Sequence, residues 1–157
     1  MKAAQLVAPG RVRVVQAEPP APAAGQVLVK ILACGVCGSD LNAWRGVTGI
    51  EYPLPLGAPG HEVWGEVAAL GSGVADEALG LGRKVTGLVQ GGYAQYALAR
   101  TDELLALPPP IADQVVLGEP LACAANVVRR TRWAPGERVA MVGFGYIAAL
   151  VVGLLFP

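Results

Sequence analysis

Apolar residues along the N-terminal part of the chain gather in short runs, separated by segments that contain glycine and proline. Within several of these runs apolar and polar residues alternate, which is the pattern of a strand with one buried face. Many short strands with Gly/Pro turns are typical of a partly open β-barrel, so we expect a mainly β protein with short helices. The expected strands cover residues 1–7, 12–15, 26–35, 61–71, 83–89 and 93–99.

Helical patterns are fewer. Ser39 is a candidate N-cap for a short helix over residues 40–46, which would end at Gly46. Residues 111–130 form the longest helical stretch, although Gly118 and Pro120 interrupt it. We therefore expect one short helix inside the barrel region and a longer helix after it.

The C-terminal segment has the order of elements that opens a dinucleotide-binding fold. An apolar strand is expected over residues 138–142, followed by a glycine turn and a helix after Gly145. Gly143, Gly145 and Ala148 fit the G-x-G-x-x-G/A fingerprint, in which the turn approaches a dinucleotide phosphate. An acidic ribose-binding residue should follow about 20 residues later, and the sequence has none there. We therefore expect the chain alone to bind NAD(H) or NADP(H) very weakly.

The same C-terminal run has a second interpretation. Residues 139–157 carry no charge and are long enough for a membrane-spanning candidate. The G-x-G spacing and the turn and strand pattern before it favour the dinucleotide-binding interpretation instead. An uncovered apolar helix and strand edge would also favour self-association, or binding to a partner chain, through residues 138–157.

Composition and charge exclude several classes of partner. The 12 basic and 12 acidic residues are spread without runs, which argues against a nucleic-acid surface and a polybasic membrane patch. Three cysteines are too few for a disulfide scaffold, and the N-terminus lacks the unbroken apolar core of a signal peptide. We therefore expect a cytoplasmic protein with no membrane or nucleic-acid partner.

Two neighbouring motifs contain candidate metal ligands. The stretch "CGVCGSD" contains a C-x-x-C pair, which is either a redox pair or half of a zinc site. Its β-rich surroundings argue against the redox pair, so Cys37 is a candidate ligand and Cys34 a small buried hydrophobe. His61, the only histidine, follows a Gly/Pro loop and is followed by Glu62. A lone histidine is more often structural, but this position can hold a side chain rigidly beside a cleft.

A third motif, "GEPLACA", offers a further ligand. Glu119 lies at the start of the expected helix, where the helix dipole alone would favour a carboxylate. Cys123 is four residues later and therefore lies on the same helix face. A catalytic zinc takes three protein ligands of N, S or O type and keeps a fourth position open. Cys37, His61 and either Glu119 or Cys123 would meet that requirement.

Six motifs occur in one order along the chain and together resemble the zinc-dependent medium-chain dehydrogenases, the alcohol and polyol dehydrogenase family. The resemblance implies a GroES-like catalytic domain over residues 1–135 and an incomplete start of the Rossmann domain over 136–157. A structural zinc lobe found in many members has no counterpart here, so a single catalytic zinc is implied. The motifs are "CGVCGSD", "GAPGHEVWGEV", "GLGRKVTG", "GGYAQYALA", "EPLACA" and "GERVAMVGFGYIA".

The resemblance implies roles for the metal ligands. Cys37 matches the first zinc ligand and His61 the second. Glu119 matches the third ligand of the polyol branch, and Cys123 lies one helical turn beyond the position used by the other branch. Glu119 is therefore preferred.

The resemblance also implies roles around the metal. Glu62 matches a carboxylate that exchanges with the bound water, and Asp40 matches a group that orients the histidine. Ser39 matches the hydroxyl that takes the proton of the substrate alcohol. Asn42 stands where some relatives have a histidine that relays this proton, so any relay here would differ.

The implied function is oxidation of a small alcohol to a carbonyl by hydride transfer to NAD(P), with the cofactor fold supplied by a missing domain or a partner. Two alternatives remain open from the residues alone. One is a zinc protein with hydrolase or lyase chemistry. The other is an inactive remnant that serves as a binding module.

Overall fold

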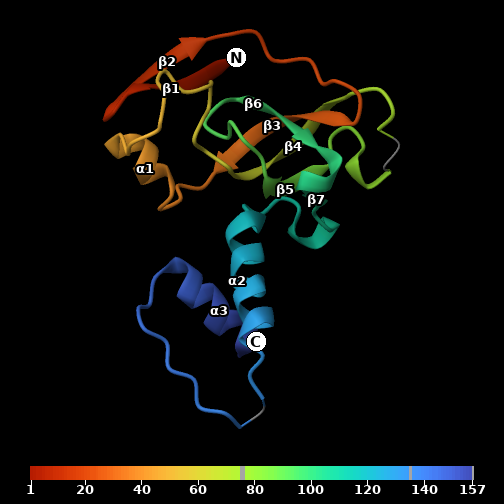
Figure 1. The fold of residues 1–157 in the computed structure, drawn as a ribbon. Helices are drawn as coiled ribbons and strands as arrows, with labels where there is room; N and C mark the ends of the chain where they lie inside the picture. Colours follow the sequence, from red (N-terminus) through yellow and green to blue (C-terminus); the bar gives the residue numbers. More distant parts are fainter. Residues whose placement is uncertain (75–76, 135, 157) are drawn as a thin grey trace. The chain divides into compact units, whose positions relative to one another are not determined.

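A computed structural model of the chain describes residues 1–74, 77–134 and 136–156 (Figure 1). Contacts divide the chain into two compact units, Met1–Gly118 and Glu119–Pro157, and each is described by itself. The domain boundary expected at residue 135 lies outside the described residues and stays a prediction.

The first unit is built from antiparallel strands. Two strands, β1 (Lys2–Ala8) and β2 (Arg11–Gln16), pair with each other. An isolated bridge between Ala3 and Ala94 joins β1 to the loop before β6. The other strands form a five-stranded sheet in the order β6-β3-β4-β5-β7. These are β3 (Gln26–Cys34), β4 (Glu62–Leu70), β5 (Lys84–Leu88), β6 (Tyr96–Arg100) and β7 (Leu104–Ala106). The mainly β fold expected from the sequence is confirmed.

Valines of the central strands make the core of this unit. Val27, Val29, Val63 and Val85 are fully buried, and Leu104 of the short strand β7 packs in the same cluster. β-branched side chains suit a pleated surface packed on one side, which is why these residues favour strands here. Cys34 packs against the edge of this cluster, as expected for a small hydrophobe.

The helix α1 (Asp40–Arg45) follows the end of β3. Gly46 closes it with φ 73°, a left-handed conformation that glycine adopts at little cost. Ser39 occupies the N-cap position, but its side chain makes no capping hydrogen bond. Ser39 itself has helical dihedral angles, φ −65° and ψ −28°, rather than the extended ones of a capping residue.

Helix α2 (Gly118–Thr131) begins later than the sequence predicted. The expected helix over 111–130 is wrong in its first turns: Pro109–Ile111 form a separate 3-10 turn, and the residues up to 117 are not helical. Pro120 instead lies in the first turn of α2. N–H groups in this turn have no intrahelical acceptor, so a proline there loses no hydrogen bond. The start of the helix therefore follows the position of proline.

Helix α3 (Tyr146–Leu155) appears where a helix after Gly145 was expected. The strand expected over 138–142 is wrong, because these residues form no strand. A strand needs a neighbour to bond its backbone N–H and C=O groups, and no described segment pairs with these residues. Among the described residues, no helix is both long enough and apolar enough to span a bilayer.

Candidate metal site

The pairing of β3 with β4 brings two of the sequence motifs together. The strands are antiparallel, and Cys34 at the end of β3 lies opposite Val63 near the start of β4. Cys37 follows β3 in the turn before α1, while Glu62 is the first residue of β4 and His61 directly precedes it. The motifs therefore meet at one end of the same strand pair.

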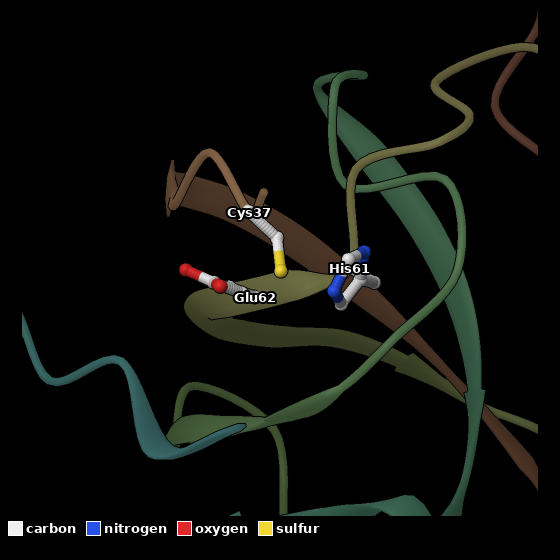
Figure 2. Close-up of side chains that lie close together, drawn as sticks. All are labelled: Cys37, His61 and Glu62. Atoms are coloured by element: carbon white, nitrogen blue, oxygen red, sulfur yellow. The ribbon is translucent and has the colours of Figure 1, made fainter. Parts of the chain in front are cut away.

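Three side chains converge at this end (Figure 2). One ligand atom each from Cys37, His61 and Glu62 lies within 4.8 Å of the other two. Figure 2 shows the Cys37 sulfur between the Glu62 carboxylate and the His61 ring. Thiolate, imidazole and carboxylate are the donor types that zinc accepts in proteins, so the set fits a zinc ion.

The imidazole of His61 is held in one orientation. Its Nδ1 lies 2.9 Å from the backbone oxygen of Pro59 and 3.4 Å from Oδ1 of Asp40. A carbonyl oxygen only accepts hydrogen bonds, so Nδ1 carries the proton and donates it. In the neutral ring, Nε2 then keeps its lone pair for a metal.

The pKa of His61 is raised above its ordinary value. Burial acts against this by favouring the neutral ring, but hydrogen bonds to the Pro59 carbonyl and Cys37 and the charge of Asp40 outweigh it. The surroundings of the ring therefore favour its protonated form.

Glu62 adds a buried carboxylate to the same place. It is only 6% exposed, and no described lysine or arginine forms an ion pair with it. Its side chain lies over Gly35, where an added Cβ would come within 1.9 Å of Glu62 Oε2. A buried carboxylate is costly without a cation or hydrogen-bond donors, so Glu62 favours a metal ion beside it.

Asp40 lies behind the histidine and is 7% exposed. Its Oδ2 accepts hydrogen bonds from the Cys37 backbone N–H at 3.0 Å and from the Tyr93 hydroxyl at 2.5 Å. Its buried Oδ1 has no hydrogen-bond partner among the described residues and faces His61. Burial and the hydrogen bond to Asp40 raise the pKa of Tyr93 well above its usual range. Sequence reasoning missed Tyr93, because its local pattern predicted an ordinary strand residue, whereas the structure places it in the turn before β6.

The alcohol dehydrogenase GroES-like domain family matches residues 23–109, which is more than half of the chain. The chain belongs to this family. Among curated relatives, L-galactonate-5-dehydrogenase of Escherichia coli (strain K12) is 33% identical and covers 84% of the chain and 46% of the relative. Sorbitol dehydrogenase of Halalkalibacterium halodurans is 32% identical, and the match covers 87% of this chain and 47% of that relative.

A solved structure agrees with these relatives. The short chain alcohol dehydrogenase (rspB) from E. coli CFT073, complexed with NADH, has a TM-score of 0.85 and 27% identity. The match covers 99% of this chain and 52% of that one. The chain thus spans about half the length of the relatives that it matches.

The remaining predicted residues of this GroES-like chain are described within the unit to which each belongs. Ser39 is exposed in the turn that carries Cys37. Glu119 and Cys123 belong to the second unit, where the Cys123 thiol donates a hydrogen bond to Glu119 Oε1 at 3.2 Å. Their roles as third ligand therefore stay predictions.

The glycine turn also lies in the second unit. Gly143 has φ 89°, Gly145 directly precedes α3, and Ala148 is in its first turn. A phosphate role for these three residues stays a prediction as well.

Proposed function

We propose that the chain is the catalytic half of a zinc-dependent alcohol or polyol dehydrogenase, which oxidises a small alcohol to a carbonyl with NAD(P) as hydride acceptor. The observation that carries this proposal is the meeting of Cys37, His61 and Glu62, with the Nδ1–H of His61 already bonded. The family membership and the dehydrogenase names of the relatives support it.

Three ligands are proposed for one zinc ion. Cys37 Sγ and His61 Nε2 come from the cluster, and the third is Glu119, with Cys123 as the alternative. Glu62 lies beside the first two and can exchange with a water molecule there. When bound, zinc supplies Lewis acidity, which makes a nearby hydroxyl easier to deprotonate.

A residue of this chain is proposed to accept the proton of the substrate hydroxyl. Ser39 is exposed and two residues from Cys37, so its oxygen can accept the proton of a substrate hydroxyl while its own hydroxyl proton passes to solvent. When bound, NAD(P) would supply a hydride acceptor, which is the chemistry that the conversion of an alcohol to a carbonyl requires. Asp40 keeps the His61 ring in place during these transfers.

For the NAD(P) cofactor, contacts are proposed with its phosphates. Gly143, Gly145 and Ala148 are proposed to approach its phosphates at the start of α3. The NADH-bound relative is about twice as long as this chain, and we assign the ribose and adenine contacts to that additional part of the fold.

The second unit is proposed to associate with a second copy or a partner chain through residues 138–157. Several large apolar side chains in this segment are exposed, among them Val142, Phe144 and Phe156. Exposed apolar patches of this kind favour association.

Metal content tests the proposed function. Protein purified without chelator should contain about one zinc per chain, as expected for a single catalytic-type site. Cys37→Ser and His61→Ala should lose the metal. Cys34→Ala is the matched control, because burial raises the pKa of its thiol to about 11 and keeps it protonated. Absence of zinc in the wild type, with no uptake on addition, would contradict the proposal.

The third ligand is tested by two further variants. Glu119→Ala should reduce zinc content more than Cys123→Ser does. The reverse order would assign the third position to Cys123. Zinc binding without alcohol oxidation, when the chain is joined to a dinucleotide-binding partner, would favour non-redox zinc chemistry.

A further inference from the structure

Both backbone polar groups of Tyr93 are hydrogen-bonded, which fixes the residue in place. Its N–H donates to Gly57 O at 3.0 Å, and its carbonyl oxygen accepts from the Ala4 N–H at 2.9 Å. The next residue, Ala94, bridges to Ala3 of β1. The Tyr93 ring lies against Gly60, where an added Cβ would be 2.7 Å from Tyr93 Cγ. The phenol therefore reaches the site from a rigid attachment.

The hydroxyl of Tyr93 has one proton and two nearby acceptors. Oδ2 of Asp40 lies at 2.5 Å and the Gly35 carbonyl oxygen at 3.2 Å. A hydrogen bond to a carboxylate is shorter and stronger than one to a neutral carbonyl, so the proton goes to Asp40. The Gly35 contact then adds little.

Asp40 is oriented by the two donors at its Oδ2. Tyr93 approaches from the loop before β6, and the Cys37 N–H from the turn before α1. With Oδ2 occupied in this way, Oδ1 is the atom that faces Nδ1 of His61, at 3.4 Å. One carboxylate thus contacts the backbone of one proposed ligand and the side chain of another. Without the Tyr93 hydroxyl, the Cys37 N–H would be the one remaining donor to Oδ2 among the described residues.

We propose that Tyr93 is a positioning residue of the metal site: its hydroxyl fixes the Asp40 carboxylate, and Asp40 in turn holds His61 with Nε2 ready to bind metal. This inference rests on the proposed zinc site. Groups that orient a metal-binding histidine commonly contribute about 10- to 100-fold to metal affinity. Tyr93 acts one step further away, so its contribution belongs at the lower end of that range.

The test measures cobalt(II) affinity of the whole chain by visible absorption, for the wild type and for Tyr93→Phe. The phenylalanine keeps the ring that packs on Gly60 and removes only the hydroxyl. We expect about tenfold weaker cobalt binding and a changed cobalt spectrum. Tyr52→Phe is the matched control, because it removes another tyrosine hydroxyl, the one that donates to the Ala43 backbone oxygen in α1. It should leave cobalt affinity unchanged.

A double-mutant cycle with Asp40→Asn separates positioning from general stabilisation. If Tyr93 acts through Asp40, the loss caused by Tyr93→Phe should shrink to about twofold or less in the Asp40→Asn background. Equal losses in both backgrounds, or wild-type affinity in Tyr93→Phe, would overturn the inference while leaving the metal site intact. A wild-type chain that binds no cobalt would overturn the proposed function, and this inference with it.

Discussion

Gly60 directly precedes His61 and lies against Tyr93. A Cβ at this position would be 2.7 Å from Tyr93 Cγ and 2.8 Å from the Tyr93 backbone nitrogen. The backbone atom cannot move away without breaking the Tyr93 N–H bond to Gly57. We therefore expect Gly60→Ala to lower the free energy of unfolding by about 1–3 kcal/mol, the usual cost of overpacking, and to weaken zinc binding.

Urea denaturation and zinc content measure both effects. Gly38→Ala is the matched control, because Gly38 adjoins Cys37 as Gly60 adjoins His61, and an added Cβ there meets nothing within 4 Å. If the two variants are equally stable and retain equal zinc, the contact between Gly60 and Tyr93 does not position the site.

The sequence identified the residues at the centre of the cluster and, through the family resemblance, Asp40 behind His61, but not Tyr93. Cys37, His61 and Glu62 could be named because their types and order match a known metal pattern. Tyr93 could not, because its contact with Asp40 depends on how the loop before β6 folds against β1. Ser39 was predicted as the N-cap from residue type alone; it occupies that position, but its side chain makes no capping hydrogen bond.

Among the elements, the central strands were predictable and the connections were not. Alternating valines determine β3 and β4, since one face of each must be buried. The start of α2 and the absence of a strand over 138–142 depend instead on proline position and on whether a partner strand exists. Strand β7 was missed, because Leu104–Ala106 is too short to show alternation.

The hydroxyl of Thr86 on β5 contacts the backbone of β4, of the loop before α2 and of the first residue of α2. Thr86 is 2% exposed, its Oγ1 lies 2.8 Å from Val63 O and 2.6 Å from Val116 O, and it accepts the Gly118 N–H at 2.7 Å. Thr86→Val should lower the free energy of unfolding by about 1–3 kcal/mol, because it leaves buried backbone groups without a partner.

Thr86→Ser is the control, since it keeps the hydroxyl and removes only a methyl group. It should cost less than Thr86→Val in urea denaturation. A valine variant as stable as the wild type would mean that the backbone groups find other partners and that the hydroxyl does not secure this junction.

On the scale of the whole molecule, the order of the motifs predicted the family better than any single motif did. Each motif alone is compatible with several folds, but the six together require one chain path, and the match over residues 23–109 agrees with it. The third ligand stays a prediction, because Glu119 and Cys123 both belong to the second unit. Metal content of the Glu119 and Cys123 variants addresses that question directly.

Residues 138–157 are predicted to mediate self-association. In the second unit Val142 is fully exposed, Phe144 is 73% exposed and Phe156 is 75% exposed. Side chains of this size stabilise a structure by about 1.5–3 kcal/mol each when they become buried, so contact with a second copy would be favourable. Light scattering should show the whole chain as a dimer or larger species and a version ending at residue 135 as a monomer.

Point variants distinguish a specific interface from non-specific hydrophobic association. Phe144→Ser and Phe156→Ser together should shift the whole chain toward monomer, because they remove two large exposed apolar side chains of this segment. Leu105→Ser is the control, since Leu105 is 66% exposed on β7 in the first unit; it should leave the molar mass unchanged. If the whole chain, the shortened version and the double variant are all monomers with equal melting temperatures, residues 138–157 are not an interface.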